Sequence, residues 1–147
     1  MNGRKSMKAR IQWLQDRAFT GISGSGHAVV MGSTTGPEGR SIGPSPMEMV
    51  LMGVGGCTAF DVIHILDKSR EPVEGCVVEL DSERAETNPQ VFIRVHMRFV
   101  VTGRGLDAAK VERAVNLSAE TYCSASAMIE KTAKITHEIE IVDSTAQ

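Results

Sequence analysis

Alternating apolar and polar residues predict strands near the start of the chain. Residues 9–20 place Ile11 and Trp13 on one face, as in a half-buried strand, and the glycine-rich residues 21–26 turn the chain into a second strand over 27–31. Residues 32–46 hold four glycines and three prolines. We therefore expect a loop there, with room for a short strand near 41–42.

The same alternation predicts three more strands. Residues 73–82 and 91–102 form a hairpin through the turn-like residues 86–90, and residues 134–142 close the chain as a strand. In the second of these strands the pattern assigns one face to Val91, Ile93, Val95, Met97 and Phe99, and the other to Phe92, Arg94, His96 and Arg98. In the last strand, Ile135, Ile139 and Ile141 share a face that only His137 interrupts.

A long helix over residues 47–69, opened by Pro46, is predicted between the strands. It is apolar on nearly every side, which is typical of a buried helix, and its polar exceptions Thr58, Asp61 and His64 form one narrow stripe. A chain of this size does not easily cover such a helix, so a partner subunit is expected to help.

Three glycines interrupt this helix directly before Cys57. Gly53, Gly55 and Gly56 each cost about 1 kcal/mol relative to alanine. We expect either close approach of another helix to the backbone or a local irregularity, and both would give Cys57 a special position.

Two helices are predicted between the last two strands. Asp107 is a good N-cap for a helix over 108–122 that turns Val111 and Val115 inward, and a short helix follows over 124–132. The order of elements predicts an α+β fold with antiparallel sheet pairing.

Composition narrows the class of protein. The chain has 147 residues, which predicts a single domain over 1–147. Its net charge is −2 and its aromatic content 4%, which argues against nucleic-acid binding. We find no apolar run of about 18 residues to suggest a membrane span. Residues 1–8 are basic without a long apolar region after them, so we expect no secretory signal and a cytoplasmic location.

Three cysteines are the candidates for chemistry, because disulfide staples are rare in a reducing compartment. Cys57 follows the glycines beside the polar stripe, and Cys123 stands at the junction of two helices, where a helix start favours a thiolate. Each is also compatible with a plain core thiol. Cys76 lies in an apolar strand and is expected to be core.

Metal and cofactor sites have little support. A metal would need Cys57, Cys123 and His64 to converge, and the chain has no Cys-x-x-Cys pair. It also has no phosphate loop or dinucleotide fingerprint, and no Gly-x-Ser-x-Gly elbow lies between a predicted strand and a predicted helix. We therefore expect no cofactor and no resident metal.

The segment Ser45–Phe60 (SPMEMVLMGVGGCTAF), together with Tyr122–Met128 (YCSASAM), resembles the OsmC/Ohr family of thiol-dependent organic hydroperoxide reductases. The resemblance covers nearly the whole chain in element order. The pair of cysteines in this context is its most specific part, and the run after Ser45 suggests a divergent OsmC-like branch.

The resemblance implies an intertwined homodimer, with antiparallel sheets from both chains wrapped around two central buried helices. It also implies an antioxidant oxidoreductase of the oxidative stress response. Cys57 would be the peroxidatic thiolate and Cys123 the resolving cysteine of a redox-active disulfide. The partners would be an organic hydroperoxide and a dithiol or thiol reductant.

The family supports its thiolate with an arginine held by a glutamate. Arg40 in the loop before the helix matches the OsmC branch, and Arg17 resembles the arginine of the Ohr branch. The usual glutamate position directly after the proline is Met47 here, and Glu48 comes one residue later. Arg40 and Glu48 are thus the candidate supporting pair.

Two alternatives keep the same fold. The departure at Met47 is compatible with a non-catalytic dimer that binds a small apolar ligand in the same pocket. A redox sensor or thiol carrier would use the same cysteines without turnover.

Overall fold

The computed structural model describes residues 5–33 and 41–145. The chain forms two compact units, Met1–Val50 and Leu51–Gln147, and their boundary falls inside helix α1 (Pro46–Lys68). The expected single domain over 1–147 stays a prediction.

The first unit contains a three-stranded antiparallel sheet in the order β1-β2-β3. Its strands are β1 (Ala9–Gln15), β2 (Ala18–Ser23) and β3 (Ala28–Gly32). The prediction of one half-buried strand over 9–20 was wrong, because the chain reverses at Asp16 and β1 is exposed along its whole length. Asp16 has φ +48°, a left-handed conformation that aspartate tolerates better than most residues. Residues 41 and 42 form no strand, and residues 34–40 of the predicted loop lie outside the described part.

The second unit contains a three-stranded sheet in the order β4-β5-β6. Its strands are β4 (Val73–Arg84), β5 (Phe92–Gly103) and β6 (Lys134–Asp143). The predicted hairpin β4–β5 is confirmed, but β6 pairs with β5 in parallel, so the expectation of purely antiparallel pairing was wrong. The cause is the connection, because a helical crossover returns the chain to the end where β5 began.

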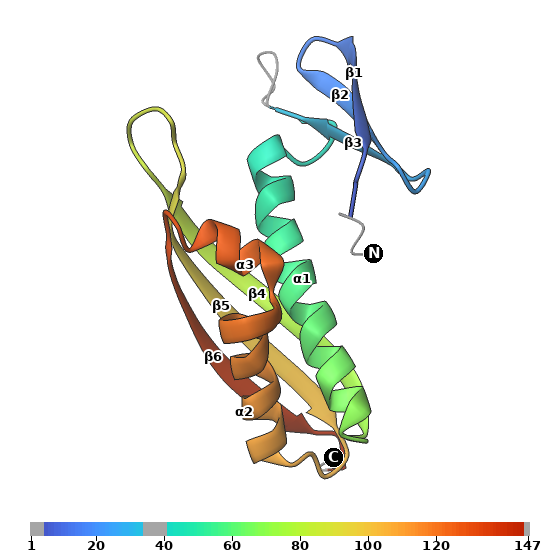
Figure 1. Ribbon diagram of the computed structural model, residues 1–147, viewed down its shortest axis with the longest axis vertical. Helices are drawn as coiled ribbons and strands as arrows, with labels where there is room; N and C mark the ends of the chain where they lie inside the picture. The colour runs from blue at the N-terminus through green and yellow to red at the C-terminus, as the bar shows by residue number, and fades with distance from the viewer. Residues whose placement is uncertain (1–4, 34–40, 146–147) are drawn as a thin grey trace. The chain divides into compact units, whose positions relative to one another are not determined.

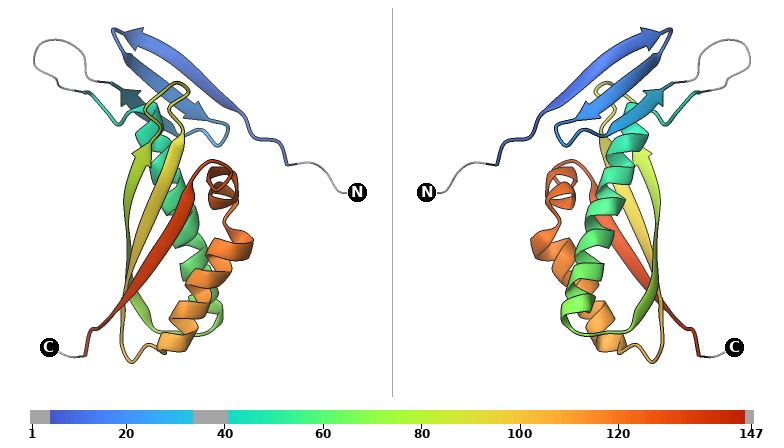
Figure 2. Two further views of the ribbon diagram at one scale, coloured as in Figure 1. Left: turned by 90° about the vertical axis from the view of Figure 1, so that its left-hand side faces the viewer. Right: turned by 90° about the vertical axis from the view of Figure 1, so that its right-hand side faces the viewer.

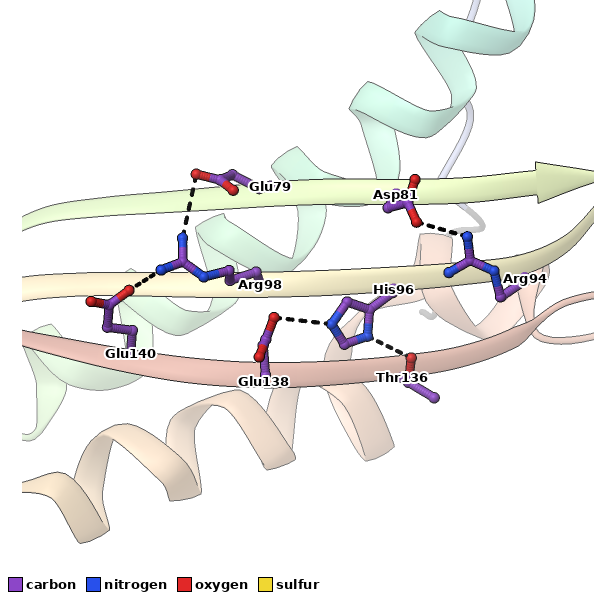
Figure 3. Close-up of polar contacts among 8 residues, drawn as sticks. All are labelled: Glu79, Asp81, Arg94, His96, Arg98, Thr136, Glu138 and Glu140. Atoms are coloured by element: carbon purple, nitrogen blue, oxygen red, sulfur yellow. Dashed lines mark hydrogen bonds and ion pairs between the residues drawn. The ribbon is translucent and has the colours of Figure 1, made fainter.

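The side chains of strand β5 alternate between a buried apolar face and a charged face of this sheet. Val95, Met97, Phe99 and Val101 are buried, while Arg94, His96 and Arg98 lie on the other face among carboxylates of β4 and β6 (Figure 3). At the start of β5 the predicted alternation is reversed: Phe92 is buried and Ile93 is 44% exposed. A register shift between Glu83 and Arg84 causes this, since the bulge adds one residue to β5.

Helices α1 and α2 (Ala108–Leu117) lie on the same face of this sheet (Figures 1 and 2). The buried stripe of α1 consists of Val54, Gly55, Thr58, Val62 and Leu66, and α2 contributes Val111, Ala114 and Val115. Thr58 Oγ1 lies 3.9 Å from Met97 Sδ of β5. The chain thus builds one core between the helices and the sheet.

Helix α1 is not buried all round within the single chain. Met52, Phe60 and Ile63 are 58%, 73% and 39% exposed. Helix α1 is also long and apolar enough to cross a membrane, by its length and composition alone. The prediction that the chain has no apolar run of about 18 residues was therefore wrong. A core helix meets the same criterion, and α1 supplies a buried stripe to the core of the second unit.

Candidate functional site

The glycine run of α1 lets the helix approach strand β4. A Cβ built on Gly55 would lie 2.6 Å from Leu80 Cδ1. The expected local irregularity is not found, because α1 stays α-helical over its whole length. A close approach is found at Gly55, but a side chain of strand β4 makes it and not another helix. A Cβ built on Gly53 or Gly56 would meet no atom within 4 Å beyond the neighbouring helix backbone, in the described part of the chain. Cys57 follows directly and is half-buried.

Cys123 reaches the site through a change of helix type. The predicted continuous helix over 108–122 ends as α2 at Leu117 and continues as a π-helical turn, η1 (Ser118–Tyr122), in which the Cys123 N–H donates to the Ser118 carbonyl at 2.9 Å. The prediction that Asp107 caps α2 is confirmed. The wider π turn changes the direction of the chain before α3 (Ser124–Ile129), and such turns are frequent at functional sites.

The two cysteines and one carboxylate converge in the second unit. Cys57 Sγ, Cys123 Sγ and a carboxylate oxygen of Asp61 lie within 4.8 Å of one another. Asp61 follows Cys57 by four residues, so both project from the same face of α1. The third group is thus Asp61 rather than His64, whose ring stacks on Phe60 at 6.3 Å.

Cys123 is the N-cap residue of α3 and is only 4% exposed. Burial raises the pKa of its thiol above the ordinary value, and the Ser126 N–H, which donates to Cys123 Sγ at 3.3 Å, acts in the opposite direction. Reagents in solution reach the half-buried sulfur of Cys57 more easily than that of Cys123.

Ser118 fixes the Asp61 carboxylate. Its hydroxyl donates to Asp61 Oδ2 at 3.1 Å, so the π turn orients both the carboxylate and the start of α3. Sequence patterns did not predict this pair. The sequence signal for the pair was Ser118 inside the predicted helix over 108–122. A serine there often forms side-chain hydrogen bonds where a helix is irregular.

A groove of about 530 Å³ runs from Asp61 between α1 and α2. Apolar parts of Ile65, Leu117 and Tyr122 line it together with three cations. These cations are Lys68, Lys110 and Arg113. None of the three forms an ion pair with another residue within ranges 5–33 and 41–145. The sequence analysis did not single out these three cations, although Lys110 and Arg113 are three residues apart and so lie on one face of α2.

The predicted supporting pair of Arg40 and Glu48 stays untested, because only Glu48 lies in the described residues. Arg40 lies outside them. Glu48 forms a capping box with Ser45: the Ser45 N–H donates to Glu48 Oε1 at 3.0 Å and the Glu48 N–H donates to Ser45 Oγ at 3.1 Å. The Ser45 backbone N–H lowers the pKa of Glu48. The Ser-x-x-Glu spacing in the sequence was enough to predict this capping box. Arg17 is exposed in the turn after β1, and the catalytic roles of these residues stay predictions.

Cys76 is half-buried in β4, and burial raises the pKa of its thiol. It lines a shallow depression beside α1 together with Gly56, Phe60 and Ile63. The expected core position is therefore only partly realised in the single chain.

Comparisons with known proteins show which proteins the chain resembles. Residues 36–138 match the family model described as OsmC-like protein. The chain is 49% identical over 136 residues to protein YhfA of Escherichia coli strain K12, covering 92% of this chain and 98% of that protein. A solved structural-genomics protein is 47% identical with a TM-score of 0.83, covering 94% of this chain and 100% of that one. An organic hydroperoxide resistance protein, OhrB of Bacillus subtilis, shares the fold at 18% identity and a TM-score of 0.60, covering 92% and 98%.

Proposed function

The chain belongs to the OsmC-like protein family, and from that premise we propose that it is a thiol-dependent peroxidase that reduces organic hydroperoxides. The observation that carries the proposal is the convergence of Cys57 and Cys123, which lie far apart in the sequence, with their sulfur atoms within 4.8 Å. Relatives of the same fold are described as hydroperoxide resistance proteins.

Cys57 is the nucleophile in this proposal because it is the more accessible sulfur. Its thiolate attacks the terminal oxygen of the hydroperoxide, the O–O bond breaks, and the alkoxide leaves as an alcohol after it takes a proton. Cys57 is then a sulfenic acid. Cys123 attacks the Cys57 sulfur, a disulfide forms, and the sulfenic oxygen leaves as water.

A dithiol reductant restores the two thiols by attack on the disulfide. Cys57 Sγ is the accessible target, so Cys123 is the leaving thiolate, which the Ser126 N–H stabilises at the start of α3. The groove beside Asp61 offers apolar walls for an organic tail and three cations for an anionic group. Substrates or reductants with a carboxylate are therefore favoured over neutral ones.

We further propose a homodimer built across the exposed side of α1. Met52, Phe60 and Ile63 form an apolar face there, and Gly53 and Gly56 leave room for close approach of a second helix. This would supply the cover that the single chain lacks.

Hydroperoxide consumption tests the peroxidase proposal. Cumene hydroperoxide and dithiothreitol are supplied to the wild type, Cys57→Ser and Cys123→Ser, with Cys76→Ser as the matched cysteine control. We expect Cys57→Ser to be inactive and Cys76→Ser to match the wild type. Equal rates for the wild type and Cys57→Ser would end the proposal.

One observation favours a second candidate, a non-catalytic member that binds a small apolar ligand. Glu48 is engaged with Ser45, and Met47 occupies the position where the family usually has its glutamate. This candidate predicts that Cys57 reacts as an ordinary thiol. Strong iodoacetamide labelling of Cys57 well below the normal thiol pKa of about 8.5 would exclude it.

A further inference from the structure

Asp61 has no role in the peroxidase chemistry. A carboxylate close to a sulfur disfavours the thiolate, because two negative charges at short range repel each other. Yet Asp61 lies within 4.8 Å of both Cys57 Sγ and Cys123 Sγ, and Ser118 holds its carboxylate in place. An oriented carboxylate close to two thiols calls for a different explanation.

We propose that the reduced Cys57–Asp61–Cys123 cluster binds one zinc ion. Two thiolates and one carboxylate are a donor set that suits Zn²⁺, and the ion converts their mutual repulsion into attraction. From Zn–S bonds of about 2.3 Å and Zn–O bonds of about 2.1 Å, tetrahedral ligands lie roughly 3.6–3.8 Å apart. The separations of at most 4.8 Å therefore need only small side-chain rotations.

The groups around the cluster are those that a metal site needs. The Ser118 hydroxyl donates to Asp61 Oδ2, which fixes the orientation of the carboxylate. The Ser126 N–H donates to Cys123 Sγ. The Ser126 hydroxyl is also buried, and it has no hydrogen-bond partner among the described residues. Hydrogen bonds to the ligands, here from the Ser118 hydroxyl to Asp61 and from the Ser126 N–H to Cys123, orient metal ligands and raise metal affinity.

The scaffold also favours a preformed site. Cys57 and Asp61 are four residues apart on α1, so one rigid helix sets two of the ligands. Cys123 is fixed by the π turn on one side and by α3 on the other. Three protein ligands leave the fourth position for water, as in open zinc sites, and Asp61 borders the groove through which water enters.

Zinc and the disulfide exclude each other, because both use the same two sulfurs. In the reaction that rests on the proposed peroxidase function, a hydroperoxide takes two electrons from the zinc-bound thiolates. The two sulfurs bond, two protons from solvent are consumed, and the products are an alcohol, water and free Zn²⁺. Zinc would thus protect the pair from oxidation, and oxidation would release zinc.

Spectroscopy of the full chain tests binding without reference to activity. Reduced protein is titrated anaerobically with Co²⁺ as the probe, and then with Zn²⁺ to displace it. We expect one Co²⁺ per chain with a thiolate-to-cobalt charge-transfer band and intense visible bands of tetrahedral geometry. Cys76→Ser should keep all of these features, whereas Cys57→Ser and Cys123→Ser should each lose most of the charge-transfer band.

Variants of the oxygen ligand and its partner sharpen the test. Asp61→Asn should weaken Zn²⁺ binding at least tenfold, and Ser118→Ala should weaken it about 10- to 100-fold. Circular dichroism checks that each variant folds, and protection of two thiols from iodoacetamide by Zn²⁺ in the wild type gives a second readout. Absence of the charge-transfer band, or unchanged affinity in Asp61→Asn, would overturn the proposed site. Zinc binding without hydroperoxide consumption would refute only the peroxidase, and the reverse result would refute only the zinc site.

Discussion

Alanine substitutions in the glycine run of α1 separate the contacts of one chain from those of a second copy. A Cβ added at Gly55 would meet Leu80 of β4, whereas one added at Gly53 or Gly56 would meet no atom within 4 Å beyond the neighbouring helix backbone, in the parts of the chain that the structure describes. Each Gly→Ala change gains the same helix propensity, about 1 kcal/mol. Differences among the three variants therefore report packing alone.

The magnitudes follow from the space around each Cβ. At Gly55 the new methyl would lie 2.6 Å from Leu80 Cδ1, so Leu80 must move. Overpacking of this kind costs about 1–3 kcal/mol, which leaves Gly55→Ala between neutral and about 2 kcal/mol less stable. In an isolated chain Gly56→Ala should be about 1 kcal/mol more stable. In the proposed dimer, the same methyl enters the helix interface and weakens association instead.

Chemical denaturation at several protein concentrations, together with sedimentation equilibrium, measures both effects, since the stability of a dimer depends on concentration. We expect Gly53→Ala and Gly56→Ala to weaken the dimer, and Gly55→Ala to give no gain in stability at any concentration. If Gly53→Ala and Gly56→Ala each add about 1 kcal/mol and leave the assembly unchanged, packing of a second copy on this face is refuted. If Gly55→Ala adds as much, the contact with Leu80 is refuted.

Three further predictions concern the second unit. Because burial raises the pKa of the Cys123 thiol, iodoacetamide should alkylate Cys123 slowly at neutral pH and faster only above the ordinary thiol pKa. Rapid labelling of Cys123 at neutral pH would contradict this. Asp107→Ala removes the cap that accepts from the Ala109 N–H and should cost about 1 kcal/mol in urea denaturation, while Asp107→Asn should retain most of it. The hydrogen bond from Arg94 and its charge lower the pKa of Asp81, so this pair stabilises the fold above the ordinary carboxyl pKa and loses its effect as pH falls through the lowered value. The difference in melting temperature between the wild type and Asp81→Asn should therefore vanish on acidification, and a constant difference down to low pH would refute it.

Periodic patterns predicted much of the fold because they report burial. The alternation through Val95, Met97 and Phe99 and the cap at Asp107 both correspond to the structure. The direction of β6 was not predictable from its own alternation, since a strand has the same pattern in either orientation. The chain reversal at Asp16 was missed because one residue in a left-handed conformation leaves the flanking alternation intact.

The candidate site was predictable only in part. The family resemblance singled out Cys57 and Cys123, and their approach depends on the whole path through β4, β5 and α2. Asp61 was noticed as a polar position on an apolar helix, but its partner Ser118 depends on a π turn that no simple periodicity reveals. Glu48 shows the opposite case, because its local capping box could have been predicted from the Ser-x-x-Glu spacing of Ser45 and Glu48.

The parallel pairing of β6 with β5 has a consequence for the order in which the molecule is made. Cys123 lies within the crossover that ends at β6, so its position is secured only when the last strand has joined the sheet. During synthesis Cys57 emerges long before that strand and has no nearby sulfur held against it. The pairing of β6 with β5 thus delays the approach of the two sulfurs until residues 134–143 have been synthesised.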